Sequence, residues 1–290
     1  MMSNQKLNIQ WFPGHMTKAK REMQSMLSMV DMVIELRDAR VPNASKNPLI
    51  DELVGQKPRL IVLTKIDKAE DEETKRWIQL LSNEYTVVVG VDVLHDNVKK
   101  IISENALFLM KEKRERQIKK GMNPRAVRCM VCGIPNVGKS TLINQIAAKK
   151  TLVTGDRPGV TKNTRWVKVN KDIELLDTPG VLWPKFEDEQ IGILLAITGA
   201  IRDQVLPLEE VAYAALKYLK VYFPERLQEA YGVTIIENNY KLFLEIGRNR
   251  NLLQKGNEVD YNRTIETFMK DIRANRFGKI TWERTDAVRE

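Results

Sequence analysis

The chain has 290 residues, of which 43% are hydrophobic and 29% charged, which is enough apolar material for one large globular domain or two ordinary ones. Its longest nearly uncharged apolar stretch, residues 191–201, is far shorter than the roughly 20 residues of a membrane span, and no signal-peptide pattern opens the sequence, so we expect a cytoplasmic protein. The formal charge of +9 favours an anionic partner, although charge alone does not separate RNA from DNA or from a membrane surface.

The first part of the chain alternates between helical and strand patterns, and the last part is helical. The sequence predicts strands at residues 30–36, 59–63, 86–91, 127–131, 165–169 and 173–176. It predicts helices between them at residues 15–29, 48–53, 72–81, 96–120 and 139–148. From residue 187 only helices are predicted, at 190–201, 208–221, 224–231, 238–246 and 261–274. Alternating strands and helices indicate a mostly parallel sheet covered on both faces, followed by a second, all-α domain.

Two cysteines, Cys129 and Cys132, are the only ones in the chain and form a C-x-x-C pattern. This spacing also occurs in redox motifs and in half of a zinc site. No second Cys/His pair completes a zinc site, and in a strand residues three apart point to opposite faces, so two buried thiols fit the pattern better.

The segment from Gly133 to Ser140, GIPNVGKS, matches the phosphate-loop pattern G-x-x-x-x-G-K-[ST] between a predicted strand and a predicted helix. Its glycines permit a tight loop whose N–H groups face phosphates, and the helix N-terminus adds partial positive charge. Lys139 is expected to neutralise the β- and γ-phosphates and Ser140 to offer a hydroxyl to Mg²⁺.

A second phosphate-sensing motif, DTPG, spans Asp177 to Gly180 at the end of a predicted strand. There Asp177 is expected to reach Mg²⁺ through a water, and the Gly180 N–H to contact the γ-phosphate. The preceding segment offers Thr161 or Thr164 as the second magnesium hydroxyl; its spacing from a Pro-Gly turn favours Thr161, and the local pattern leaves Thr164 open.

TKID, from Thr64 to Asp67, ends a predicted strand and resembles the guanine-reading N-K-x-D motif, with threonine in place of asparagine. The Asp67 carboxylate can accept hydrogen bonds from guanine N1–H and N2–H₂, a donor pair that adenine lacks. Lys65 is expected to lay its aliphatic stem along the base. A weaker candidate for a backbone contact to the guanine oxygen is the loop at residues 90–92.

The base-reading motif precedes the phosphate loop, whereas most Ras-like GTPases have the opposite order. We therefore predict an α/β fold: a circularly permuted Ras-like P-loop GTPase domain over residues 1–185, followed by an all-α domain over 186–290, whose basic residues suggest RNA as a partner. The predicted nucleotide-binding residues are Thr64, Lys65, Asp67, Asn136, Val137, Gly138, Lys139, Ser140, Thr141 and Gly180. The predicted metal ligands are Ser140, Thr161 and Asp177.

With these motifs, the sequence resembles the circularly permuted GTPases of the YlqF type over nearly its whole length. The resemblance also rests on Trp11 to Met16, Asp38 to Arg40, Pro158 to Thr161 and Leu195 to Ile201. It implies GTP hydrolysis coupled to late assembly of the large (50S) ribosomal subunit, with ribosomal RNA as the main partner, and it assigns Thr161 as the switch threonine. GTP and GDP are the expected ligands of a monomer that binds neither DNA nor membrane.

Catalysis needs a group to position water, because Val181 follows DTPG where many GTPases have glutamine. The resemblance points to His15, and imidazole chemistry permits the role. Lys139 and Thr161 complete the predicted catalytic set. Asn136 matches the phosphate-loop asparagine of potassium-activated GTPases, which suggests K⁺ beside Mg²⁺ as a cofactor.

Basic residues mark the expected RNA-facing surface. They lie at Lys18, Lys20 and Arg21, through residues 111–128, and at Arg248, Arg250, Arg263, Arg273, Arg276 and Lys279.

Two other functions stay open from the sequence: a P-loop kinase or ATP-driven enzyme, which would prefer adenine, and an RNA-binding scaffold with a vestigial nucleotide site. The scaffold would require that Lys139, Ser140 or Asp177 be replaced by a residue that cannot bind phosphate or metal, and all three are present.

Overall fold

The computed structural model describes residues 21, 23–147, 165–178, 188–201, 203 and 207–288. These residues form two compact units. The sheet unit contains the described residues up to 178 together with 283–288, and the helical unit contains those from 188 to 282. Within these ranges no helix is both long enough and apolar enough to cross a bilayer.

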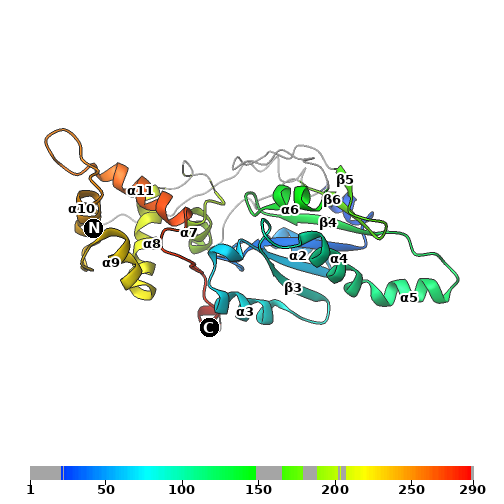
Figure 1. Cartoon of the computed structure of the whole chain (residues 1–290). Helices are drawn as coiled ribbons and strands as arrows, with labels where there is room; N and C mark the ends of the chain where they lie inside the picture. Colours follow the sequence, from blue (N-terminus) through cyan, green and yellow to red (C-terminus); the bar gives the residue numbers. More distant parts are fainter. Residues whose placement is uncertain are drawn as a thin grey trace. The chain divides into compact units, whose positions relative to one another are not determined.

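The sheet unit is built on six strands (Figure 1). They are β1 (Met32–Asp38), β2 (Arg59–Thr64), β3 (Thr86–Val91), β4 (Val127–Gly133), β5 (Arg165–Lys168) and β6 (Ile173–Asp177). Their order across the sheet is β3-β2-β1-β4-β6-β5, and all neighbours pair in parallel except β5 with β6. The predicted mostly parallel sheet is confirmed, each strand within two residues of its predicted ends.

Apolar side chains cover both faces of the central strands. On one face Val33 of β1 packs with Ile50 and Met130, and a second cluster forms around Ile61 and Trp77. On the opposite face, side chains such as Leu36 are fully buried. All seven residues of β1 are buried, including Glu35 and Arg37. This burial on two sides is what a parallel sheet between helical layers requires.

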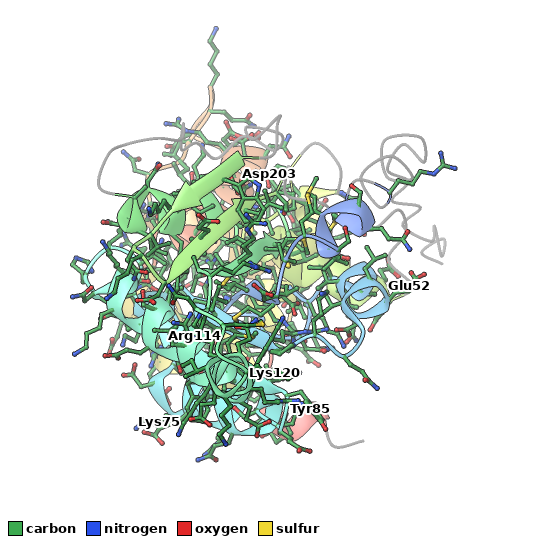
Figure 2. All side chains as sticks on the ribbon, turned by 90° about the vertical axis from the view of Figure 1, so that its right-hand side faces the viewer. Glu52, Lys75, Tyr85, Arg114, Lys120 and Asp203 are labelled. Carbon is green, nitrogen blue, oxygen red and sulfur yellow. The ribbon has the colours of Figure 1, made fainter. Side chains whose placement is uncertain are left out.

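The helices of the sheet unit follow the strands closely. They are α2 (Pro48–Val54), the single turn η1 (Ile66–Lys68), α3 (Asp71–Leu81), α4 (Val98–Leu109), α5 (Lys111–Lys119) and α6 (Lys139–Ile146). The single helix predicted over 96–120 is wrong, because the chain bends at Met110 into α4 and α5. Buried side chains at Val98, Ile102 and Ala106 hold α4 on the sheet, whereas α5 buries none; Arg114 and Lys120 lie in the foreground of Figure 2.

The helical unit contains α7 (Glu189–Ile197), α8 (Leu208–Tyr222), α9 (Pro224–Tyr231), α10 (Asn239–Asn249) and α11 (Tyr261–Arg273). Its core includes Phe243 and Phe268, whose rings meet edge to face with centroids 5.1 Å apart. The helix predicted to run to residue 201 ends at Ile197, since Gly199 adopts a φ of 76° that stops the helix.

The end of the chain does not stay with the helices. The predicted boundary placed residues 186–290 together, but residues 283–288 belong to the sheet unit. The reason is a set of hydrogen bonds: the Asn43 and Ala44 N–H groups donate to the Glu283 carboxylate at 2.7 and 3.0 Å, and Trp77 Nε1 donates to the Glu283 carbonyl at 2.8 Å. Arg284 pairs with Glu73 at 3.2 Å.

The two cysteines are buried free thiols on opposite faces of β4, with Cys132 in one core cluster. Burial raises the pKa of both thiols well above its usual range. Because the thiolate is the reacting form, we expect neither cysteine to react with Ellman's reagent in the native protein and both to react in denaturant. Rapid labelling of one native thiol would contradict this burial.

Arg273 forms several hydrogen bonds inside the helical unit. Its guanidinium donates to both Asp203 oxygens at 2.8 and 2.6 Å and to the Ala196 carbonyl, at the end of α7, at 2.7 Å. Arg276 likewise donates to the Ala230 carbonyl and covers the Tyr231 ring, so both arginines have partners inside the unit. Their part in an RNA-facing surface stays a prediction.

Reversing the charge of Arg273 tests its structural role. We expect Arg273→Glu to lower the free energy of unfolding by about 3 kcal/mol, because it removes the cap of α7 and places a carboxylate beside Asp203. Urea unfolding followed by circular dichroism measures this. Arg263→Glu, at an exposed position on the same helix, should cost less than about 0.5 kcal/mol, and equal losses in the two variants would contradict the structural role.

Candidate functional site

The predicted motifs meet at the carboxyl edge of the sheet. Strands β2 and β3 lie on one side of β1, and β4, β6 and β5 lie on its other side. Ligands of open α/β sheets bind in the crevice beyond the strand ends where the order reverses, which here is between β1 and β4. The chain leaves β4 into the phosphate loop, β2 into TKID and β6 into DTPG.

The phosphate loop depends on unusual backbone conformations. Gly133 has a φ of 151°, and a Cβ there would lie 2.7 Å from the Leu36 carbonyl oxygen. Asn136 and Gly138 have φ values of 58° and 102°, and α6 begins at Lys139. A left-handed loop leading into a helix N-terminus turns successive N–H groups toward one point, an arrangement that binds phosphate.

Lys139 lies folded back into this loop. Its Nζ donates to the carbonyls of Gly133 and Ile134 at 2.9 and 2.8 Å, and the residue is 7% exposed. Burial lowers the pKa of Lys139 to about 8, an effect that the nearby Asp177 carboxylate opposes. A phosphate anion would supply the counter-charge that favours the ammonium form, so the site is suited to an anionic ligand.

Asp177 ends β6 and is 1% exposed. The next residue, Thr178, anchors the strand end by donating from Oγ1 to the Val131 carbonyl at 2.8 Å. The described residues contain no cluster of three or more His, Cys, Asp or Glu side chains suited to a metal. A single buried carboxylate with the Ser140 hydroxyl nevertheless fits Mg²⁺, which commonly takes one or two carboxylates and completes its shell with phosphate and water.

The TKID loop is hydrogen-bonded directly to the phosphate loop. The Thr64 hydroxyl lies 2.7 Å from the Val137 carbonyl oxygen and 3.1 Å from that of Arg37. Lys65 Nζ donates to the Asn136 carbonyl at 2.8 Å. Thr64, which stands where the motif has asparagine, thus joins the two loops, and Asp67 is exposed in η1.

Asp38 joins this arrangement from the end of β1. Its carboxylate accepts from Lys65 Nζ at 3.0 Å and from Arg40 Nε and Nη2 at 2.9 and 2.7 Å. Arg40 and Lys65 hold the pKa of Asp38 well below its usual range although burial acts to raise it. In the sequence, Asp38-Ala39-Arg40 supported the family resemblance, but no role was predicted for it. Its position at a strand end beside the crevice was the signal that could have indicated a role at the site.

Several predicted residues lie outside the described part of the chain: His15, Thr161, Thr164 and Gly180. Thr64, Lys65, Asn136, Val137, Gly138 and Lys139 come together at one site, with Asp177 beside Lys139. Ser140 and Thr141 follow in the first turn of α6.

Known proteins resemble this chain over nearly its full length. It is 47% identical over 283 residues to ribosome biogenesis GTPase A of Bacillus cereus, covering 97% of this chain and 96% of that protein. The chain belongs to the ribosome biogenesis GTPase A family. The Thermotoga maritima member of the ribosome biogenesis GTPase A family is 30% identical, covering 96% of this chain and 95% of that protein.

Other comparisons agree with ribosome biogenesis GTPase A. A family model described as 50S ribosome-binding GTPase matches residues 128–227. The crystal structure of GNP-bound YlqF from T. maritima superposes with a TM-score of 0.64 at 24% identity, covering 92% of this chain and 98% of that one, which supports the fold. The predicted circularly permuted GTPase fold and the assignment as a GTPase are confirmed.

Proposed function

We propose that this GTPase binds a late precursor of the large ribosomal subunit in its GTP form, is stimulated by it, and leaves after hydrolysis. The observation that carries this proposal is the bonding of the base-reading loop to the phosphate loop, Thr64 Oγ1 to the Val137 carbonyl at 2.7 Å. This contact supports a single nucleotide site built from two motifs about seventy residues apart. Family membership supports the ribosomal partner.

Each residue of the site has a proposed task. Asp67 selects guanine by accepting two hydrogen bonds, and Lys139 neutralises the phosphates. Ser140, Asp177 and Thr161 would hold Mg²⁺, which would neutralise charge that develops on the phosphates. Gly180 senses the γ-phosphate, and the N–H groups from Asn136 to Thr141 cradle the phosphates. The proposed γ-phosphate sensor, Asp177 to Gly180, is followed directly by the chain that leads to the helical unit.

Water is positioned in this proposal by His15, since valine follows DTPG at position 181. Potassium held at Asn136 would supply the positive charge that an arginine finger otherwise supplies. We expect faster GTP hydrolysis in KCl than in NaCl when large subunits are present. Equal rates in the two salts would eliminate the potassium site while leaving the GTPase assignment intact.

Ribosomal RNA is the proposed anionic partner of a cytoplasmic monomer that binds no DNA. In the segment 111–128, several basic residues form ion pairs inside the chain: Lys113 and Arg125 with Asp31, Arg114 with Asp172, and Arg128 with Glu174. In the helical unit the exposed Arg248 and Arg263 are better candidates for phosphate contacts. Reversing both charges should weaken subunit binding and leave GTP affinity unchanged.

The deciding experiment measures GTP turnover with and without purified large subunits. We expect turnover per protein to rise when subunits are added, and excess ATP not to compete. A Lys139→Met variant with the same subunits corrects for contaminating GTPases. Turnover that subunits leave unchanged would argue against an assembly role, and competition by ATP would favour a P-loop enzyme of another class.

A further inference from the structure

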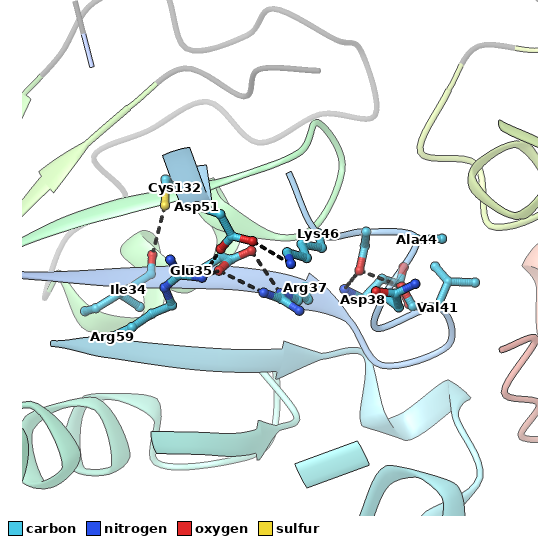
Figure 3. Close-up of polar contacts among 12 residues, drawn as sticks. Ile34, Glu35, Arg37, Asp38, Val41, Ala44, Lys46, Asp51, Arg59 and Cys132 are labelled. Atoms are coloured by element: carbon cyan, nitrogen blue, oxygen red, sulfur yellow. Dashed lines mark hydrogen bonds and ion pairs between the residues drawn. The ribbon is translucent and has the colours of Figure 1, made fainter. Parts of the chain in front are cut away.

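The carboxylate of Asp38 is enclosed at the end of β1, where it is 2% exposed (Figure 3). Arg40 binds it through two guanidinium contacts and also donates its own N–H to Oδ1 at 3.0 Å. This bidentate geometry fixes the plane of the carboxylate, and the second oxygen faces Lys65 Nζ at 3.0 Å. The neighbouring carboxylate of Glu35 instead pairs with Arg37 within β1 and with Arg59 of β2.

Lys65 is held in a conformation that it would not adopt without support. Its backbone has a φ of 59°, in the left-handed region that is unfavourable for a side chain of this kind. The Nζ atom bridges the Asp38 carboxylate and the Asn136 carbonyl, which itself belongs to a left-handed residue of the phosphate loop. Two strained loops are thus connected by a single ammonium group.

The loop that carries Asp38 is itself fixed from both sides. The Asp38 N–H donates to Ser45 Oγ at 2.9 Å, and Ser45 Oγ donates to the Val41 carbonyl at 2.7 Å. Farther along, the Glu283 carboxylate accepts from the Asn43 and Ala44 N–H groups. Asp38 therefore has little freedom to follow Lys65, and Lys65 has to adjust to Asp38.

We propose that Asp38, oriented by Arg40, is a positioning residue for guanine nucleotides. It aims Lys65 so that one side chain holds the phosphate loop at Asn136 and lays its stem where the base binds, next to Asp67. This inference rests on the proposed nucleotide site and adds a third strand end, that of β1, to the loops that determine affinity. The effect of Asp38 passes through Lys65, so the two residues should not act independently.

A double-mutant cycle tests that dependence. The dissociation rate of a fluorescent GDP analogue is measured for the wild type, Asp38→Asn, Lys65→Met and the double variant. We expect each single change to speed dissociation by about tenfold to a hundredfold, the range for loss of a charge-assisted hydrogen bond. The double variant should dissociate no faster than Lys65→Met. Multiplied effects, or unchanged dissociation in Asp38→Asn, would overturn the proposal.

Controls separate positioning from general stability. Asp31→Asn removes a partly buried carboxylate that lies directly before β1 and pairs with Lys113 and Arg125, and it should leave dissociation unchanged. If Asp38→Asn does not fold because Arg40 loses its partner, Asp38→Glu keeps the charge and enters the same cycle under the same criterion. Failure of the wild type to bind the analogue would instead refute the nucleotide site itself.

Discussion

Asp67→Asn should lower GTP affinity by at least about a hundredfold and make xanthosine triphosphate the better ligand. The Asp67 carboxylate offers two acceptors to guanine N1–H and N2–H₂, and it stands exposed in η1, beside Lys65. An asparagine amide offers one acceptor and one donor. Xanthine carries an oxygen in place of the amino group, so it matches the variant. Equilibrium binding of the two labelled nucleotides gives the affinity ratio.

A matched variant shows whether the change is specific to the base. Asp71→Asn makes the same chemical and charge change four residues later, at the exposed start of α3, and it should leave both affinities as in the wild type. A GTP to xanthosine triphosphate ratio that Asp67→Asn does not alter would mean that another residue reads the base. Equal weakening of both ligands would indicate damage to the loop instead of a change in recognition.

Much of this site could be predicted from local sequence because each motif has its own geometric signature. A strand, a glycine loop, a lysine and a helix start specify the segment from Gly133 to Ser140, and the six strands follow from runs of apolar residues. Helix lengths were less predictable. The break at Met110 depends on where α4 stops burying side chains, and the end of α7 depends on a left-handed Gly199.

What local patterns could not predict were contacts between distant segments. The Asp38–Lys65–Asn136 connection joins residues from three loops, and the bonds of Glu283 to residues 43 and 44 join positions about 240 apart in the chain. A count of charges misses contacts inside the fold for a related reason. Arg273 and Arg276 look like RNA-binding residues in a list of basic positions, but the fold uses them to bind helix carbonyls. Composition gives the number of charges and not their partners.

Lys139→Met should reduce GTP and GDP affinity by at least about a hundredfold, because the variant loses the only charge that the phosphate loop itself supplies to the phosphates. The nucleotide-free protein should nevertheless fold. Methionine removes a buried ammonium whose pKa burial lowers to about 8, and this gain offsets the loss of hydrogen bonds to the Gly133 and Ile134 carbonyls. Binding loss and retained stability are therefore expected in one variant.

Thermal melts with and without GDP measure both effects at once. A ligand that binds only the folded state raises the melting temperature of the wild type, and saturating GDP should not raise that of Lys139→Met. Without nucleotide the two proteins should melt within a few degrees of each other. A large loss of stability in the nucleotide-free variant would mean that Lys139 holds the loop together through its two carbonyl contacts. The contacts of Lys139 with Gly133 and Ile134 would then serve mainly to stabilise the loop, which would need the ammonium group even when no phosphate is bound.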